Sequence, residues 1–157
     1  MNEVFYLILL TLTPFLESRA SIPYGILVLK MPVWFVFAVA IGINILMGFF
    51  WYYIYDKVIH LLRYVKPLEK LYQKYVERTQ KKIHPYVEKY GEWGLIAFIG
   101  VPLPGSGVIS GSLAGYLLGM SKKHVHLGII FGAIIAGLLV TAITLSGSGL
   151  FSFLLKV

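Results

Sequence analysis

The sequence contains no cysteine and very few charged residues. Without cysteine, the chain can form neither a disulfide nor a thiolate-based metal or redox centre. Charged residues make up 13% of its 157 residues and apolar residues make up 58%, whereas a soluble domain has about 25% charged residues. So few polar groups could not cover a water-facing surface. The composition therefore excludes a disordered chain and a soluble globule, and it predicts a single integral membrane domain over residues 1–157.

Acidic residues are scarce, because 7 Asp and Glu stand against 14 Lys and Arg, for a formal net charge of +7. In a soluble domain this excess of basic residues would suggest a nucleic-acid partner. In a membrane protein, basic residues mark the cytoplasmic loops, and most of them here lie within 57–91. We therefore predict a multi-pass protein of the cell membrane with 57–91 in the cytoplasm, whose partners are membrane lipids and not nucleic acid.

Only two uncharged runs are long and unbroken enough to span a bilayer, which takes about 20 apolar residues. They predict transmembrane helices at 33–56 and 124–149. The remaining apolar stretches are shorter or interrupted by proline, glycine and charge, which disfavour a continuous helix. We expect these stretches, 4–30 and 93–121, to be re-entrant helical hairpins that enter the membrane and return to the same side.

The charge pattern orients these elements. If 93–121 returns to the cytoplasmic side, Lys122 and Lys123 lie in the cytoplasm, as basic residues prefer. The hairpin 4–30 then lies on the outer side. The predicted fold is all-α, with hairpin and span repeated twice in opposite orientation. Inverted repeats with broken helices are typical of secondary transporters.

The segment 57–91 shows a helical apolar seam formed by Leu61, Val65, Leu68, Tyr72, Tyr75 and Thr79. It predicts a basic amphipathic helix. Such a helix lies on the anionic inner leaflet in one interpretation, and forms a gate or a homodimer contact in the other.

Glu17 and Arg19 are charged residues inside an otherwise apolar hairpin, where a charge is costly and usually functional. In an extended joint over 14–25 the two side chains would share a face, whereas on a helix they would diverge by about 200°. As a functional pair, Arg19 would hold an anionic group and Glu17 would take up a proton or cation. As a structural pair, they would neutralise each other.

The second joint, 102–107, is rich in proline and glycine, and a helix starting near Val108 would point its positive dipole end toward it. This position suits a phosphate or carboxylate. The candidate substrate- or ion-binding residues at both joints are Glu17, Arg19, Ser21, Pro23, Pro102, Pro104, Gly105, Ser106 and Gly107, with Asn44 and Ser110 as further candidates. Gly111, Gly115 and Gly119 form small-xxx-small steps that favour close helix packing. No catalytic or metal-binding motif is found, so we predict no enzyme, cofactor or metal site.

Two motifs carry a resemblance to a known family: Pro-Phe-Leu-Glu-Ser-Arg-Ala-Ser-Ile-Pro-Tyr-Gly at 14–25 and Val-Pro-Leu-Pro-Gly-Ser-Gly-Val-Ile-Ser-Gly-Ser-Leu-Ala-Gly at 101–115. Together they resemble the putative small multidrug export protein family, over nearly the whole chain. The resemblance implies export of a drug-like compound.

The second motif, preceded by Tyr90 and Gly91, also resembles the DedA (VTT-domain) superfamily. That resemblance implies two facing re-entrant hairpins and, in several members, proton- or sodium-coupled translocation of lipid phosphates. Both arginines of that motif are replaced here, by Val101 and Gly107.

These observations predict a small, ion-coupled secondary transporter of an amphipathic molecule, such as a lipid phosphate or a drug-like compound, with its site between the two joints. The alternative is a non-transporting membrane scaffold or membrane-shaping protein in which Glu17 and Arg19 form a structural ion pair.

Overall fold

The computed structural model describes residues 2–14, 16–62, 90–102 and 106–154, and this part of the chain is helical with no strand. The prediction of an all-helical fold is confirmed for these residues. The elements are α1 (Asn2–Leu12), α2 (Glu17–Pro23), the π-helix η1 (Tyr24–Val28), α3 (Val33–Leu62), a helical stretch at 90–100, α5 (Val108–Leu117) and α6 (Lys122–Leu154). Most of the segment predicted to be a cytoplasmic amphipathic helix, 63–89, lies outside the described residues.

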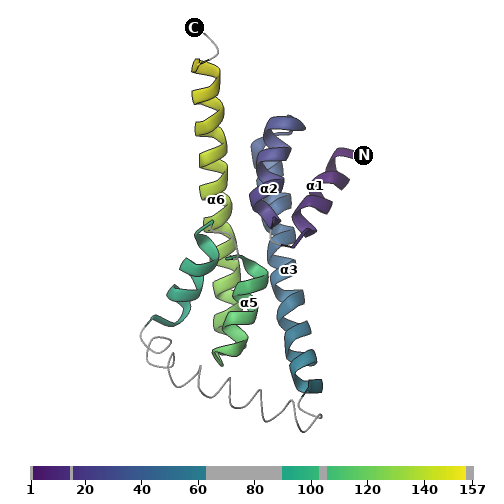
Figure 1. Ribbon diagram of the computed structural model, residues 1–157, viewed down its shortest axis with the longest axis vertical. Helices are drawn as coiled ribbons and strands as arrows, with labels where there is room; N and C mark the ends of the chain where they lie inside the picture. Colours follow the sequence, from purple (N-terminus) through teal and green to yellow (C-terminus); the bar gives the residue numbers. More distant parts are fainter. Residues whose placement is uncertain (1, 15, 63–89, 103–105, 155–157) are drawn as a thin grey trace.

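The two long helices, α3 and α6, contact each other and run in opposite directions (Figure 1). Both are long and apolar enough to cross a membrane, over Val33–His60 and Lys122–Gly147. The starts predicted from the sequence, at residues 33 and 124, lie within two residues of the observed starts of α3 and α6. The first predicted span ends at residue 56, although α3 continues to Leu62. Asp56 and Lys57 end the uncharged run but are compatible with a helix, so the helix outlasts its apolar part.

The helices α1 and α2 form a pair in which α2 folds back beside α1 and also contacts α3 and α6. A short turn joins them, with the Glu17 amide donating to the Thr13 carbonyl at 3.1 Å. The structure differs from the broken joint expected over 14–25, because Glu17–Pro23 is helical and a π-helix follows it. Of the two geometries considered for Glu17 and Arg19, the helical one is present. Pro23 ends α2 and lacks an amide hydrogen, and the chain continues in the wider π turn.

The second pair consists of the helical stretch 90–100 and α5, separated by a break that begins at Val101. α5 begins at Val108, as predicted. A Cβ on Gly111 would collide with the Ile99 side chain, and one on Gly115 would lie 2.8 Å from Val125 Cγ2. Glycines at these positions therefore let α5 pack closely against 90–100 and α6. Gly119 has a different role, because it follows α5 with a φ of 69°.

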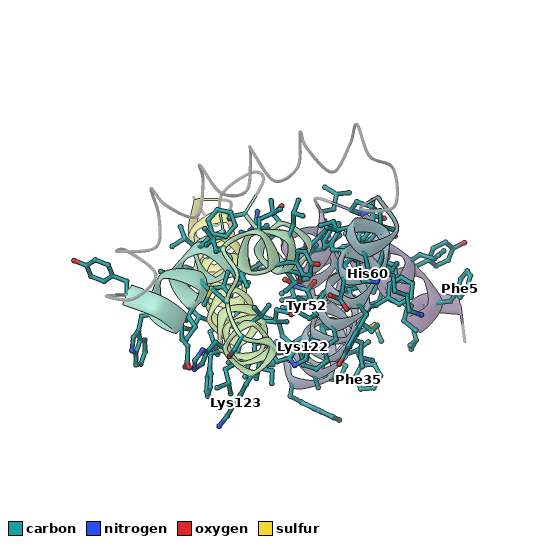
Figure 2. The ribbon with its side chains drawn as sticks, turned by 90° about the horizontal axis from the view of Figure 1, so that it is seen from below. Phe5, Phe35, Tyr52, His60, Lys122 and Lys123 are labelled. Atoms are coloured by element: carbon teal, nitrogen blue, oxygen red, sulfur yellow. The ribbon has the colours of Figure 1, made fainter. Side chains whose placement is uncertain are left out.

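The two pairs approach the long helices from opposite ends (Figure 1). Gly25, near the end of the first pair, lies against Val36 in the first turn of α3, whereas Gly48 of α3 lies close to Val108 at the start of α5. Tyr52 of α3 is buried, and its ring centroid lies 5.9 Å from that of Tyr116 and 5.4 Å from that of His126. Figure 2 shows Tyr52 directed between the helices. We call the joint between the two helices of a pair its tip. The tip of the first pair lies next to Glu17 and that of the second next to Ser106, and the two tips meet near the middle of the α3–α6 pair.

Candidate functional site

Glu17 is the central residue of the contact between the two tips. It begins α2 and is only 5% exposed. Its carboxylate reaches the first turn of α5, where Oε2 accepts from the Val108 amide at 3.3 Å and Oε1 accepts from the Ile109 amide at 3.4 Å. The first amides of a helix have no partner within the helix and carry its positive dipole end. The carboxylate of one helix pair thus caps the broken helix of the other.

Gly107 is what allows this close approach. A Cβ at this position would lie 2.7 Å from both carboxylate oxygens of Glu17. The φ of Gly107 is 171°, which is ordinary extended backbone, so the requirement for glycine is one of space and not of conformation.

Arg19 reaches the same tip through Ser106. Its Nη2 donates to the backbone carbonyl of Ser106 and to the Ser106 hydroxyl, the latter at 2.9 Å. The Ser106 hydroxyl in turn donates to the Val101 carbonyl at 2.7 Å, which closes the break between 90–100 and α5. Ser106 is therefore the residue that connects Arg19 to the backbone of the second joint.

The two charged side chains meet the same tip even though both lie on a helix. We expected residues at these positions of a regular helix to diverge. Glu17 has a φ of +46°, in the left-handed region that non-glycine residues rarely adopt, and this turns its side chain away from the regular helical direction. Such a conformation costs about 1–3 kcal/mol and persists only where surrounding contacts hold it. Glu17 and Arg19 are also close enough to interact electrostatically.

Asn44, a further candidate from the sequence, completes the site from the middle of α3. It is 2% exposed, its Nδ2 donates to the Ser18 hydroxyl at 3.1 Å, and its amide lies beside the Glu17 carboxylate. Asn44 Oδ1 has no hydrogen-bond partner, and neither has the hydroxyl of the fully buried Ser21. Ser18 was not predicted. The signal was present, because residues 17, 18 and 21 are polar and cluster on one helical face.

The other predicted residues lie as follows. Pro23 is half-buried at the end of α2, away from the tip, and Pro102 is half-buried after the break. Ser106 and Gly107 are buried at the contact, whereas Ser110 is half-buried one turn into α5. Pro104 and Gly105 lie outside the described residues. Ser112 joins two elements, because its hydroxyl donates to the Gly48 carbonyl of α3 at 2.8 Å.

The site combines charged side chains with neutral polar groups. In the part of the chain that the structure describes, no three His, Cys, Asp or Glu side chains cluster in a way that would hold a metal. The site offers instead a carboxylate, a guanidinium, two helix-terminal amides and buried neutral oxygens.

Two long apolar helices with a charged contact buried between shorter helices define a helical membrane protein. A family model described as "Putative small multi-drug export protein" matches residues 17–139, from Glu17 to the middle of α6, and the chain belongs to this family. The family name indicates a small export or transport protein. No curated protein and no solved structure matches the chain. The resemblance to the DedA superfamily stays a prediction from the sequence.

Proposed function

We propose that the chain is a small secondary transporter, and that its substrate site lies where Glu17 and Arg19 of the first helix pair meet the tip of the second. The observation that carries this proposal is the position of two charged side chains at the buried meeting point of two broken helices. Charged residues within a membrane protein's interior mark substrate or ion pathways, and broken helices pointing at such a site are typical of transporters.

The proposed membrane arrangement makes both pairs re-entrant. The pair α1–α2 enters from the outer side, and the pair of 90–100 and α5 enters from the cytoplasm. The lengths of the helices support this arrangement, because α1 and α5 rise only about 15–17 Å, roughly half the hydrocarbon thickness. Their opposite ends in Figure 1 support the inverted repeat.

Alternating access follows from making and breaking the contact between the tips. With Glu17 and Arg19 bound to α5 and Ser106, the two tips are held together. A charged headgroup that replaces these contacts would separate the tips and open a path on one side. A proton on Glu17 would weaken its contact with the α5 amides, because a neutral carboxyl accepts more weakly than a carboxylate. This provides the proposed ion coupling.

One observation favours the second candidate, a non-transporting scaffold. Both carboxylate oxygens of Glu17 already have a backbone donor, which is the arrangement expected of a permanent clamp. A scaffold would keep this contact closed, whereas a transporter has to open it.

The variants Glu17→Gln and Arg19→Gln separate the two candidates. Both are expected to reduce transport more than about tenfold, because each removes one partner of a buried charged contact. The measurement is efflux from vesicles of a fluorescent lipid phosphate and, in parallel, of a lipophilic cationic dye. Size-exclusion profiles and unfolding temperatures show whether each variant is folded. Full transport of both probes by both folded variants would exclude Glu17 and Arg19 as the transport site. No efflux by the wild-type chain above that of protein-free vesicles would favour the scaffold.

A further inference from the structure

The contact between the tips has an acceptor side and a donor side. The acceptor side consists of the Glu17 carboxylate and Asn44 Oδ1, and the Ser21 hydroxyl is a further buried acceptor four residues along α2. The donor side consists of the Arg19 guanidinium and the two amides that open α5. The site is therefore polarised, and it presents opposite chemistry to the two ends of a bound group.

Two atoms on the acceptor side stand out because they are buried without a partner. Asn44 Oδ1 belongs to a residue that is 2% exposed, and the Ser21 hydroxyl belongs to a fully buried residue. Asn44 lies beside the Glu17 carboxylate, and Ser21 is buried in the same helix, α2, four residues after Glu17. A buried polar atom without a partner is unfavourable, so each signals a missing group that can fill it. Asn44 Oδ1 accepts hydrogen bonds only, which requires a ligand with hydrogen-bond donors.

The charges at the site restrict the ligand further. Glu17 and Arg19 carry opposite charges, and residues 101–107 of the opposing tip include no charged side chain. An organic cation or anion bound alone would leave one charge uncompensated in a buried site, which is strongly unfavourable. A group that carries both signs would leave the site neutral.

We infer, resting on the transport function proposed above, that the substrate carries a zwitterionic headgroup with a primary ammonium and a phosphate or carboxylate. The ammonium pairs with Glu17 and donates to Asn44 Oδ1 and the Ser21 hydroxyl. The anionic group takes the place of the Glu17 carboxylate at the α5 amides and pairs with Arg19. The substrate thereby satisfies both orphan oxygens and supplies the counter-charges that separate the tips.

The test compares amphiphiles with the same dodecyl chain, added at neutral pH to the purified protein in a non-ionic detergent. Dodecyl phosphoethanolamine carries the proposed headgroup, and dodecylphosphocholine has the same charges but no N–H donor. Dodecyl phosphate carries negative charge only and dodecylamine carries positive charge only. Free phosphoethanolamine, without the chain, shows whether the headgroup alone suffices or a lipid is needed. Affinity is obtained from the concentration dependence of the unfolding temperature.

Dodecyl phosphoethanolamine is expected to bind the wild-type chain at least about tenfold more tightly than the other three amphiphiles, as the loss of a charge-assisted hydrogen bond implies. Asn44→Leu or Ser21→Ala should bring its affinity close to that of dodecylphosphocholine. Glu17→Gln should reverse the preference toward dodecyl phosphate. Thr144→Val is the matched control, because this buried hydroxyl donates within α6, to the Val140 carbonyl. It should leave the order unchanged.

Tighter or equal binding of dodecyl phosphate or dodecylamine by the wild-type chain would overturn the zwitterion assignment. So would binding that Asn44→Leu and Ser21→Ala both leave intact, or no binding of the zwitterion at all. None of these results bears on whether Glu17 and Arg19 are needed for transport. The transport proposal itself can be refuted only by the vesicle experiment above.

Discussion

The contact between the two helix pairs depends on a few side chains, and they can meet only because the residue at position 107 is a glycine. Glu17 caps α5 only because Gly107 has no Cβ, and it adopts a left-handed backbone conformation while doing so. The cost of that conformation is offset by two hydrogen bonds to a carboxylate at a helix terminus. In the proposed transporter, this is the contact that opens.

Gly107→Ala tests this contact. The added Cβ would lie 2.7 Å from both carboxylate oxygens of Glu17, so the side chain has to leave α5. We expect a loss of about 1–3 kcal/mol in the free energy of unfolding, together with loss of transport. Denaturant titration in detergent and vesicle efflux are the measurements. Gly42→Ala is the control, because no atom lies within 4 Å of a Cβ built there. Equal effects of the two substitutions would refute the role assigned to Gly107.

At the scale of elements, the position of α5 is set by its contact with the helical stretch before it. α5 lies against α3, α6 and 90–100, and small residues at Gly111 and Gly115 bring the backbones close. The Ser112 hydroxyl adds a hydrogen bond to the backbone of α3. Since membrane helices gain little from apolar burial alone, close packing of small residues is what holds such a pair together.

Gly111→Ala tests this packing. The new Cβ would collide with Cγ1 and Cδ1 of Ile99, and the pair could accommodate it only by separating. We expect the free energy of unfolding to fall by about 1–3 kcal/mol.

Ile99→Ala added to Gly111→Ala should recover part of that loss, because the second change removes the clashing atoms. Gly94→Ala in the same pair is the control, since its nearest neighbour would be Tyr90 Cβ at an ordinary 3.8 Å. A loss that Ile99→Ala does not relieve would mean that another contact is responsible.

At the scale of the whole molecule, the ends of the long helices set the topology. The start of α1 and the end of α6 lie toward the same end of Figure 1, whereas α6 begins at the opposite end. The chain has no cysteine, so a single introduced cysteine can be labelled without background.

We expect cysteines at Lys122 and at position 75 to react with a membrane-impermeant thiol reagent only from the cytoplasmic side. Cysteines at Glu3, Met31 and position 157 should react only from the outside. The reason is the concentration of basic residues in 57–91, which favours the cytoplasm for that segment. Intact and permeabilised cells provide the two conditions. Labelling at Lys122 from the same side as at Glu3 would contradict the inverted arrangement.

The membrane class, the two long helices and the break before Val108 could be predicted from the sequence, whereas a functional role for Glu17, Arg19 and Asn44 stays a prediction. These features follow from local properties: the length of apolar runs, the effect of proline and glycine on a helix, and the cost of a charge in an apolar segment. The helix through Glu17–Pro23 could not be predicted, because a proline at its end suggested an extended joint and tertiary packing overrode that preference.

Only the tertiary structure decided what Glu17 and Arg19 contact. Local sequence left open whether they pair with each other or bind a ligand, whereas the folded chain brings both to a tip some ninety residues away, at Val108 and Ser106. It also left Asn44 Oδ1 and the Ser21 hydroxyl buried without partners. Contacts between distant segments depend on how α3 and α6 set the two pairs relative to each other. Composition and periodicity do not encode that spacing, which is why the two unpartnered oxygens could be found only in the fold.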